Sequence, residues 1–441
     1  MILAGEKDRA LGMDYYITDS PGCGGAIKSS AEDFLVSEVF EDLRYEGGRY
    51  LVLDVEKTNW DTHHLIREMA RRLRISQKRF GWAGTKDKKA VTRQRISIMN
   101  LDESALESVK LPDLKITVLG RTNRAVGLGD LLGNQFQITI RELCGPDPAA
   151  RLAAVTGEIE KQKGVPNYFG VQRFGDIRPV THRVGEALTR GSIEEAVFIY
   201  LALPFAGEPA GTREARERLW KDRDIPAALK ALPGYLHYEL AMCNYLVEHP
   251  GDYAHSFDVL SPNLKRLFVH AYQSYLFNRI LSRRLAAGLL LTRAEEGDVV
   301  CFARGGLPDM EKTQAVTPDN LEAVNRLAER GRAFLTLPLI GFETVLGEGA
   351  EGEIERKVIG EEGISRQGFR VLQNPDLGSR GTRRAALCPV IPQIEVEETL
   401  AKLQFVLPKG SYATVVLREY MKSADVIRNQ SENQPGNKPC N

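Results

Sequence analysis

The stretch Asn134-Gln135-Phe136-Gln137-Ile138-Thr139-Ile140-Arg141-Glu142 decides the fold class, because its polar and apolar side chains alternate strictly. Phe136, Ile138 and Ile140 share one side, and Gln135, Gln137 and Thr139 share the other. A period of two predicts a strand with one apolar and one polar face, as is typical of antiparallel sheets. We therefore expect a strand-rich domain around this segment.

Further strands are predicted on both sides of this stretch. They span residues 33–40, 50–56, 95–99, 403–407 and 414–417. Asn59 or Asp61 is placed to cap a helix that runs to about Arg74, with an apolar residue at every fourth position. Residues 81–89 are predicted to form a tight loop between this helix and the strand that follows.

The middle of the chain has a different character. From residue 164 to residue 391 helical patterns dominate, for example from Leu264 to Leu285, and turns with Pro and Gly separate them. The simplest organisation is an α+β domain built from residues 1–163 and 392–422 and interrupted by an insertion of residues 164–391. Residues 423–441 are polar and are predicted to be a disordered tail.

Composition excludes several classes of protein. The 441 residues carry 59 Lys and Arg against 59 Asp and Glu, and 43% of them are hydrophobic, which is typical of a globular protein. No apolar run reaches the roughly 18 residues of a membrane span, so we expect a soluble, cytoplasmic protein without a membrane partner. The six cysteines are scattered without ligand spacing, so neither a zinc site nor a disulfide scaffold is expected.

One segment is strongly basic although the whole chain is neutral. Between Arg67 and Arg95, eleven basic residues stand against Glu68 and Asp87, an excess of nine positive charges. A solvated helix face is the plain alternative. Because the excess continues through helix, loop and strand, we favour a polyanion as partner, held by phosphate contacts that supply affinity and positioning. The candidate backbone contacts are Arg71, Arg72, Lys78, Lys86, Lys88 and Lys89.

Asp87 is the exception within the basic segment. Flanking lysines would keep this carboxylate ionised, as a functional anion requires. A turn Asp that bonds to its own backbone is the alternative, since Gly84 and Thr85 are close by. The charge pattern alone leaves both interpretations open.

Three familiar catalytic or nucleotide-binding motifs are absent. The glycines and Lys86 of the 81–86 segment lack phosphate-loop spacing, and Asp87 stands where a metal-binding hydroxyl would be needed. The glycines of 127–133 miss the dinucleotide spacing and precede a strand. The G-x-S-x-G motif, which carries the nucleophilic serine of many Ser-His-Asp hydrolases, does not occur. A nucleotide-dependent enzyme or a serine hydrolase is therefore disfavoured.

A set of motifs in fixed order is more specific than any single piece. The set comprises Ile27-Lys28-x-x-x-Glu32-Asp33-Phe34-x-Val36-x-Glu38, Ala83-Gly84-Thr85-Lys86-Asp87, Gly133-Asn134-x-Phe136, Asn167-Tyr168-Phe169-Gly170-x-Gln172-Arg173-Phe174-Gly175, and Leu407-Pro408-x-Gly410-Ser411-Tyr412. Together they closely resemble the TruD family of tRNA pseudouridine synthases over about residues 27–420. The long middle segment, about 207–261, resembles archaeal or eukaryotic-type members.

This resemblance implies a role for individual residues. Asp87 would be the catalytic aspartate and Lys28 its ion-pair partner. Asn134 and Phe136 would contact and stack on the target base, Phe34 and Tyr412 would complete the pocket, and Glu38 would support it. A core role is the alternative for Phe34 and Phe136, and Phe169 and Phe174 are expected to be structural.

The resemblance also implies the fold and the reaction. The fold would be a pseudouridine-synthase core with a mixed, mainly antiparallel sheet, plus an inserted TRUD-type α/β domain with the RNA cleft between them. The reaction would isomerise uridine 13 of tRNA without a metal or an organic cofactor, and tRNA would be the partner. Asp87 would either attack C1′ or remove the C2′ proton. An RNA-binding protein that has lost catalysis is the second hypothesis.

Overall fold

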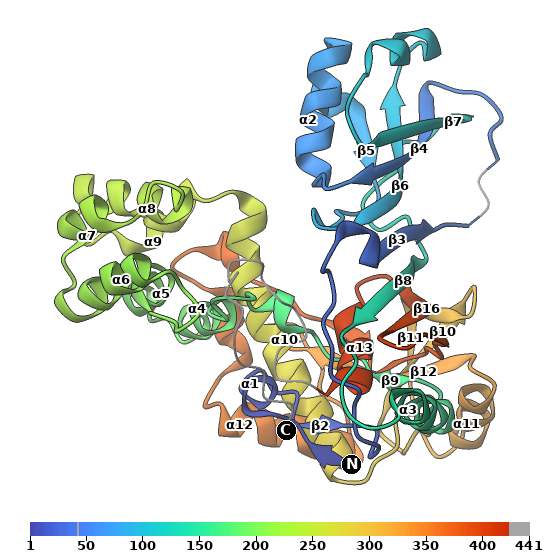
Figure 1. The fold of residues 1–441 in the computed structure, drawn as a ribbon. Coiled ribbons are helices and arrows are strands. Elements are labelled where there is room, and N and C mark those ends of the chain that lie inside the picture. The colour runs from blue at the N-terminus through green and yellow to red at the C-terminus, as the bar shows by residue number, and fades with distance from the viewer. Residues whose placement is uncertain (42–43, 423–441) are drawn as a thin grey trace.

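The largest sheet joins segments from both ends of the chain. The computed structural model describes residues 1–41 and 44–422, so the predicted tail 423–441 lies outside the described residues (Figure 1). In spatial order the sheet contains β15 (Gln393–Val396), β16 (Leu400–Pro408), β8 (Gly133–Arg141), β3 (Phe34–Val39), β6 (Val91–Met99), β4 (Tyr50–Thr58) and β7 (Leu114–Thr122), with β5 (Phe80–Trp82) also on β6. Only β3 and β6 run parallel. The predicted mixed, mainly antiparallel sheet is confirmed.

The alternating stretch forms β8, at the centre of this sheet. It pairs with β16 from Leu400 opposite Arg141 to Pro408 opposite Gly133, so strands far apart in the sequence lie side by side. On its other side β8 pairs with β3. The chain therefore returns to its first domain after the long middle segment.

The predicted first helix is α2 (Thr62–Leu73). Asp61 is its N-cap, because its side chain accepts a hydrogen bond from the His64 amide at 2.9 Å. Asn59, the alternative cap, lies outside the helix. Leu65 and Met69 are fully buried with residues of β4 and β6, which fixes the helix against the sheet.

Two local predictions are wrong. Residues 414–417, predicted as a strand from their β-branched side chains, lie in α13 (Ala413–Met421), every residue of which is buried. Packing on all sides has overridden β propensity here. The predicted loop 81–89 begins later than expected, because Gly81 and Trp82 belong to β5 and pair with Ser97 and Ile96 of β6.

The middle of the chain combines helices with a second sheet. Its helices are α4 (Thr181–Thr189), α5 (Ile193–Ala202), α6 (Ala210–Asp222), α7 (Ile225–Ala231), α8 (His237–Glu248), α9 (Tyr253–Ser256), α10 (Pro262–Ala286), α11 (Leu321–Glu329) and α12 (Gly349–Glu361). Its sheet has the order β11 (Leu307–Ala315), β10 (Val299–Arg304), β12 (Ala333–Leu339), β13 (Thr382–Ala385). No helix in the described part of the chain is long and apolar enough to cross a membrane.

The remaining strands and helices are short, apart from α3. They are β1 (Ile2–Leu3), α1 (Glu6–Arg9), β2 (Tyr15–Tyr16), α3 (Pro148–Gln162), β9 (Val165–Pro166) and β14 (Leu387–Cys388). β9 pairs with β14, so the two ends of the middle segment meet. This pairing suits the proposed insertion of residues 164–391, which stays a prediction.

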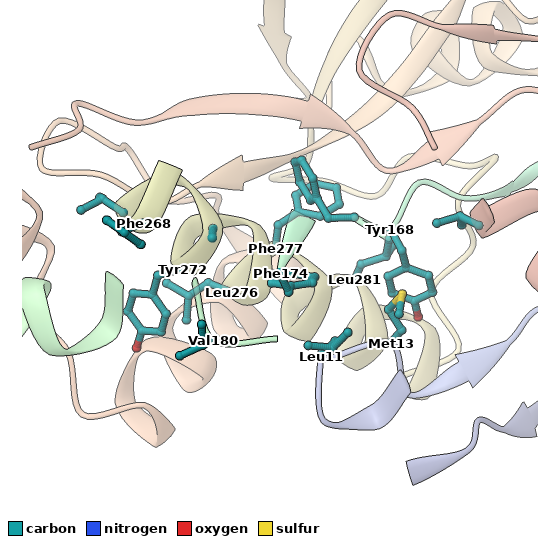
Figure 2. Packing of buried hydrophobic residues seen from close by; sticks show 14 of the residues in the cluster. Leu11, Met13, Tyr168, Phe174, Val180, Phe268, Tyr272, Leu276, Phe277 and Leu281 are labelled. Carbon is teal, nitrogen blue, oxygen red and sulfur yellow. The ribbon is translucent and has the colours of Figure 1, made fainter. Parts of the chain in front are cut away.

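The first residues of the chain pack against α10 of the middle segment. Figure 2 shows Leu11 and Met13 close to Leu281, and Tyr168 beside them. Asn278 of α10 bonds to both partners, since its Nδ2 donates to the Leu11 carbonyl at 2.9 Å and its Oδ1 accepts from the Phe169 amide at 2.8 Å. The sequence contains no periodic pattern that would predict this contact.

Candidate active site

Lys28 and Asp87 form an ion pair. The Lys28 ammonium lies 2.6 Å from Oδ2 of Asp87, and the two side chains are 12% and 59% exposed. The same ammonium stands 4.2 Å from the centre of the Phe34 ring, which limits its movement. Asp87 is therefore an accessible carboxylate held by a largely buried cation, the arrangement that a reacting carboxylate needs. Its catalytic role stays a prediction.

The backbone of Lys28 adds a second constraint. Its φ of 57° lies in the left-handed region, which costs a non-glycine residue about 1 kcal/mol. Such a conformation persists only where the surroundings hold it. The side chain of the same residue is held by Asp87 and Phe34.

Lys86 and Glu38 form a second, buried ion pair beside the first. Lys86 Nζ lies 2.6 Å from Oε1 of Glu38, and Oε2 of the same carboxylate accepts from the Arg95 amide at 2.9 Å. Burial raises the pKa of Glu38, and Lys86 opposes that rise. The Lys86 amide also donates to Thr62 Oγ1 at 3.0 Å, at the start of α2. These bonds fix the loop that carries Asp87.

This pair changes the prediction for Lys86. Its side chain is only 7% exposed and its charge already faces Glu38. A phosphate could reach it only by breaking a buried ion pair, so the geometry favours a structural role over the predicted RNA contact. Lys88 and Lys89, by contrast, are exposed.

A third lysine near the site was missed by the sequence analysis. Lys57 of β4 is 1% exposed, and its ammonium donates to the Trp60 carbonyl. Burial lowers the pKa of Lys57 to about 8, while Asp61, Asp87 and Glu38 act in the opposite direction. The sequence does contain a pattern that predicts its burial, because Lys57 continues the alternation of Leu51, Leu53 and Val55 on the buried face of β4.

Asn134 presents an unsatisfied polar atom. Its Oδ1 is buried and has no hydrogen-bond partner in the described part of the chain. In the sheet Asn134 lies opposite Glu38 of β3 on one side and Leu407 of β16 on the other. Buried polar atoms without partners are costly, so a ligand donor would stabilise this one. The N–H and carbonyl edge of uracil suits an amide side chain.

Two of the predicted pocket rings, Phe136 and Phe34, are packed inside the protein. Phe136 is 8% exposed, and its ring lies 5.6 Å from that of Phe405 and 6.1 Å from that of Phe34. Phe34 is 4% exposed. This cluster favours the core role that the sequence analysis gave as the alternative, and contact with a base stays a prediction. Tyr412, at the start of α13, is only half-buried and is the more accessible ring.

The residues after Asn167 complete the site from the middle segment. The ring of Phe169 lies 5.9 Å from that of Tyr412, and Gln172 Oε1 accepts from Thr414 Oγ1 at 2.9 Å. Asp176 follows on this segment, and burial raises its pKa while Lys28 opposes and Asp87 adds to that rise. Neither Arg173 nor Asp176 was singled out from the sequence.

The other candidate RNA contacts lie away from Asp87. Arg71 and Arg72 are exposed in the last turn of α2, about 14 Å along the helix axis from Thr62. Lys78 is exposed beyond that end, and Arg71 pairs with Glu68 at 2.7 Å. In Figure 1 α2 runs up the left side of the upper lobe, away from β8. These residues could meet only a partner that extends well beyond the site.

The chain matches one known family over nearly its whole length. The model of the family described as tRNA pseudouridine synthase D (TruD) matches residues 10–420. The chain belongs to the TruD family. Its resemblance to that family, stated above from the motifs, is confirmed.

Individual TruD relatives match over nearly the whole chain. A protein of Methanosarcina mazei named "Probable tRNA pseudouridine synthase D" is 48% identical over 427 residues, 95% of this chain and 98% of its own. One of the same name from Methanococcoides burtonii is 47% identical, over 94% of this chain and 97% of its own. A crystal structure of the Methanosarcina mazei protein described as TruD has a TM-score of 0.84 at 47% identity, covering 96% and 99% of the two chains. These relatives are archaeal, which is one of the two alternatives given above for the long middle segment.

Proposed function

We propose that this TruD-family chain is a tRNA pseudouridine synthase that isomerises a uridine of tRNA, at position 13, to pseudouridine. The accessible carboxylate of Asp87, held at 2.6 Å by Lys28, carries this proposal. An RNA-binding surface has no use for an anion among lysines, whereas a reaction at the sugar requires one. We infer that the enzyme acts in the cytoplasm, where tRNA is modified.

The reaction has three steps at the target nucleotide. The C1′–N1 bond breaks, the uracil turns while bound, and C5 joins C1′, after which the C5 proton leaves and N1 gains one. The base must first leave its stack, at a cost of about a few kcal/mol, which stacking on an aromatic ring partly offsets. Tyr412 is the accessible ring for this contact, and Asn134 offers the buried amide for the uracil edge.

Asp87 would act on the sugar by one of two routes. Its carboxylate either attacks C1′ and is later displaced by C5, or removes the C2′ proton and later returns it. Both routes need an ionised, correctly placed carboxylate. Lys28 supplies the positive charge at that position, and the Glu38–Lys86 pair holds the loop.

Mapping of pseudouridine in total RNA tests this proposal. Cells that lack the protein should lose pseudouridine at position 13 of their tRNAs, and the unaltered gene should restore it. A gene encoding Asp87→Asn should not restore it. Pseudouridine that is unchanged without the protein would favour the RNA-binding alternative.

A further inference from the structure

One face of α10 carries two basic residues and a serine, and Arg173 bonds to that serine. Arg266, His270 and Ser274 follow one another at intervals of four residues and therefore share a helix face. The buried Ser274 hydroxyl donates to the His270 carbonyl at 2.8 Å and accepts from Arg173 Nε at 3.1 Å. Arg173 is thus fixed on this face, one turn after His270.

The charge of Arg173 has no compensating carboxylate. Within residues 1–41 and 44–422, only the Nε of this side chain has a hydrogen-bond partner, and no acidic group lies within ion-pair distance. Burial lowers the pKa of Arg173. His270 is affected in turn, since burial, Arg173 and Arg266 lower its pKa. The positive charge of this face therefore lies on Arg173 and Arg266, whereas the lowered pKa of His270 favours its neutral form.

The fully buried arginines of the middle segment, unlike the half-buried Arg173, each pair with two carboxylates. Arg216 pairs with Glu208 at 2.8 Å and with Glu239 at 2.9 Å. Arg284 pairs with Asp298 at 2.8 Å and with Glu351 at 2.5 Å. A buried charge without a partner is costly. Arg173 is only half-buried and has no acidic partner among the described residues, so its Nη groups remain available to an external anion.

The position of Arg173 suggests what that anion is. Its guanidinium lies 5.9 Å from the centre of the Phe169 ring, which itself lies 5.9 Å from that of Tyr412. The guanidinium of Arg384 stands 4.2 Å from the centre of the same Phe169 ring, and among the described residues it bonds only to oxygens of Asn167 and Gly410. The two guanidinium groups thus lie at the Phe169 ring, whose neighbour Tyr412 is the ring on which the target base is proposed to rest.

We propose that Arg173, with His270 and Arg266, forms an anion subsite that binds one phosphodiester group of the RNA strand close to the target uridine. The free Nη groups of an arginine match two phosphate oxygens in a fork. The inference rests on the proposed function, which makes RNA the ligand and places the base near Tyr412. It adds a contact from the middle segment to the flipped nucleotide.

The test combines protein variants with neutral linkages in the RNA. Binding of substrate tRNA is measured in an Asp87→Asn background, so that the RNA is not converted. Single methylphosphonate linkages replace the phosphates around the target uridine in turn. Arg173→Gln removes the charge, Arg173→Lys keeps it, and Arg218→Gln, an exposed arginine of α6 without a described partner, is the matched control.

The expected result is a specific loss. Arg173→Gln should weaken binding about 10- to 100-fold and lower the slope of log K against log salt by about 0.7–0.9, whereas Arg218→Gln should do neither. Arg173→Lys should keep most of the slope. At one of these positions, the methylphosphonate linkage should weaken tRNA binding by the parent protein and leave tRNA binding by Arg173→Gln unchanged. Thermal melting verifies that each variant is folded.

The failures of the two proposals can be told apart. Equal tRNA affinity of Arg173→Gln and the parent, or equal sensitivity of both to every neutral linkage, would overturn the anion subsite alone. Tight, Arg173-dependent binding by a protein that forms no pseudouridine would overturn the proposed function alone. A folded parent protein that binds no tRNA would overturn both.

Discussion

The ammonium group of Lys86 lies 2.6 Å from the Glu38 carboxylate, and neither side chain is open to solvent. The next residue, Asp87, faces Lys28 and is exposed. Neighbouring residues of opposite charge thus serve opposite purposes. The buried pair anchors the loop, and its anchoring sets the place of the exposed carboxylate.

Lys86→Met should destabilise the protein by about 3–5 kcal/mol, because the charge of Glu38 would remain buried without its partner. Combining it with Glu38→Gln should recover part of this loss. Urea unfolding of the single and double variants gives the free energies of unfolding. Equal stability of Lys86→Met and the parent would show that the pair does not hold the loop.

The RNA contacts predicted for this loop can be separated by their salt dependence. The double variant Lys88→Gln/Lys89→Gln should lower the slope of log K for tRNA against log salt by about 1.4–1.8, since each phosphate contact contributes about 0.7–0.9. Arg71→Gln/Arg72→Gln on the far end of α2 should change it only if the tRNA extends that far. A comparable loss of slope in Lys86→Met would instead support the predicted phosphate contact of Lys86.

Phe136 and Tyr412 should respond differently to truncation. Phe136→Ala removes a ring packed against Phe405 and Phe34, so we expect a loss of about 3–5 kcal/mol in stability. Tyr412→Ala should stay folded and lose activity about 5- to 150-fold, as expected for about 1–3 kcal/mol of base stacking. A stable, inactive Phe136→Ala protein would instead support its predicted role as the stacking platform.

The sequence predicted those parts of the fold that rest on local patterns. Strict alternation located β8, and the spacing of Leu65 and Met69 with the cap at Asp61 located α2. Order and identity of the motifs placed Lys28 and Asp87 together, although 59 residues separate them. Such motifs carry information about tertiary contacts that periodicity alone does not.

Other features depend on packing between distant segments and escaped prediction. Residues 414–417 favour a strand by composition, but burial on every side makes them helical in α13. The proposed role of Arg173 depends on its bond to Ser274, 101 residues later, and on the absence of an acidic partner among the described residues. Neither can be read from the local sequence. The burial of Lys57 could have been predicted, since it continues the alternation of Leu51, Leu53 and Val55 on the buried face of β4. The charged groups around it could not.

Lys57 should make stability depend on pH in the alkaline range. Burial lowers the pKa of Lys57 to about 8 in the folded protein, from 10.5. Between these values the unfolded chain binds more protons, so the free energy of unfolding should rise with pH, by at most about 3 kcal/mol. Lys57→Met should lack this rise. The difference between the two proteins in urea unfolding at pH 7 and pH 10 isolates the effect, and a constant difference would contradict it.

Lys28→Met should slow the reaction without removing it. Asp87 would keep its carboxylate but lose the ammonium that positions it, and a displacement of about 1 Å can cost a reaction about 100-fold. We expect kcat to fall by about 10- to 100-fold and KM for tRNA to change little. Lys28→Arg should restore part of the rate because it keeps the charge. If Lys28→Arg and Lys28→Met are equally slow, charge is not what Lys28 contributes.

Asp87→Asn tests the carboxylate itself, because the amide keeps the size of the side chain and removes only its charge. The carboxyl group is 59% exposed, so the substitution should leave the free energy of unfolding within about 0.5 kcal/mol of the parent. For RNA binding, the loss of one negative charge among lysines should leave the affinity unchanged or slightly higher. The rate should nevertheless fall by at least about 10⁴-fold, since an amide neither attacks C1′ nor takes a C2′ proton.

Tritium release from tRNA labelled at C5 of uridine measures the rate, and filter binding of the same RNA measures affinity. Normal tritium release by a folded Asp87→Asn protein would exclude this carboxylate as the reacting group and point to Asp176, the other acidic side chain near Lys28.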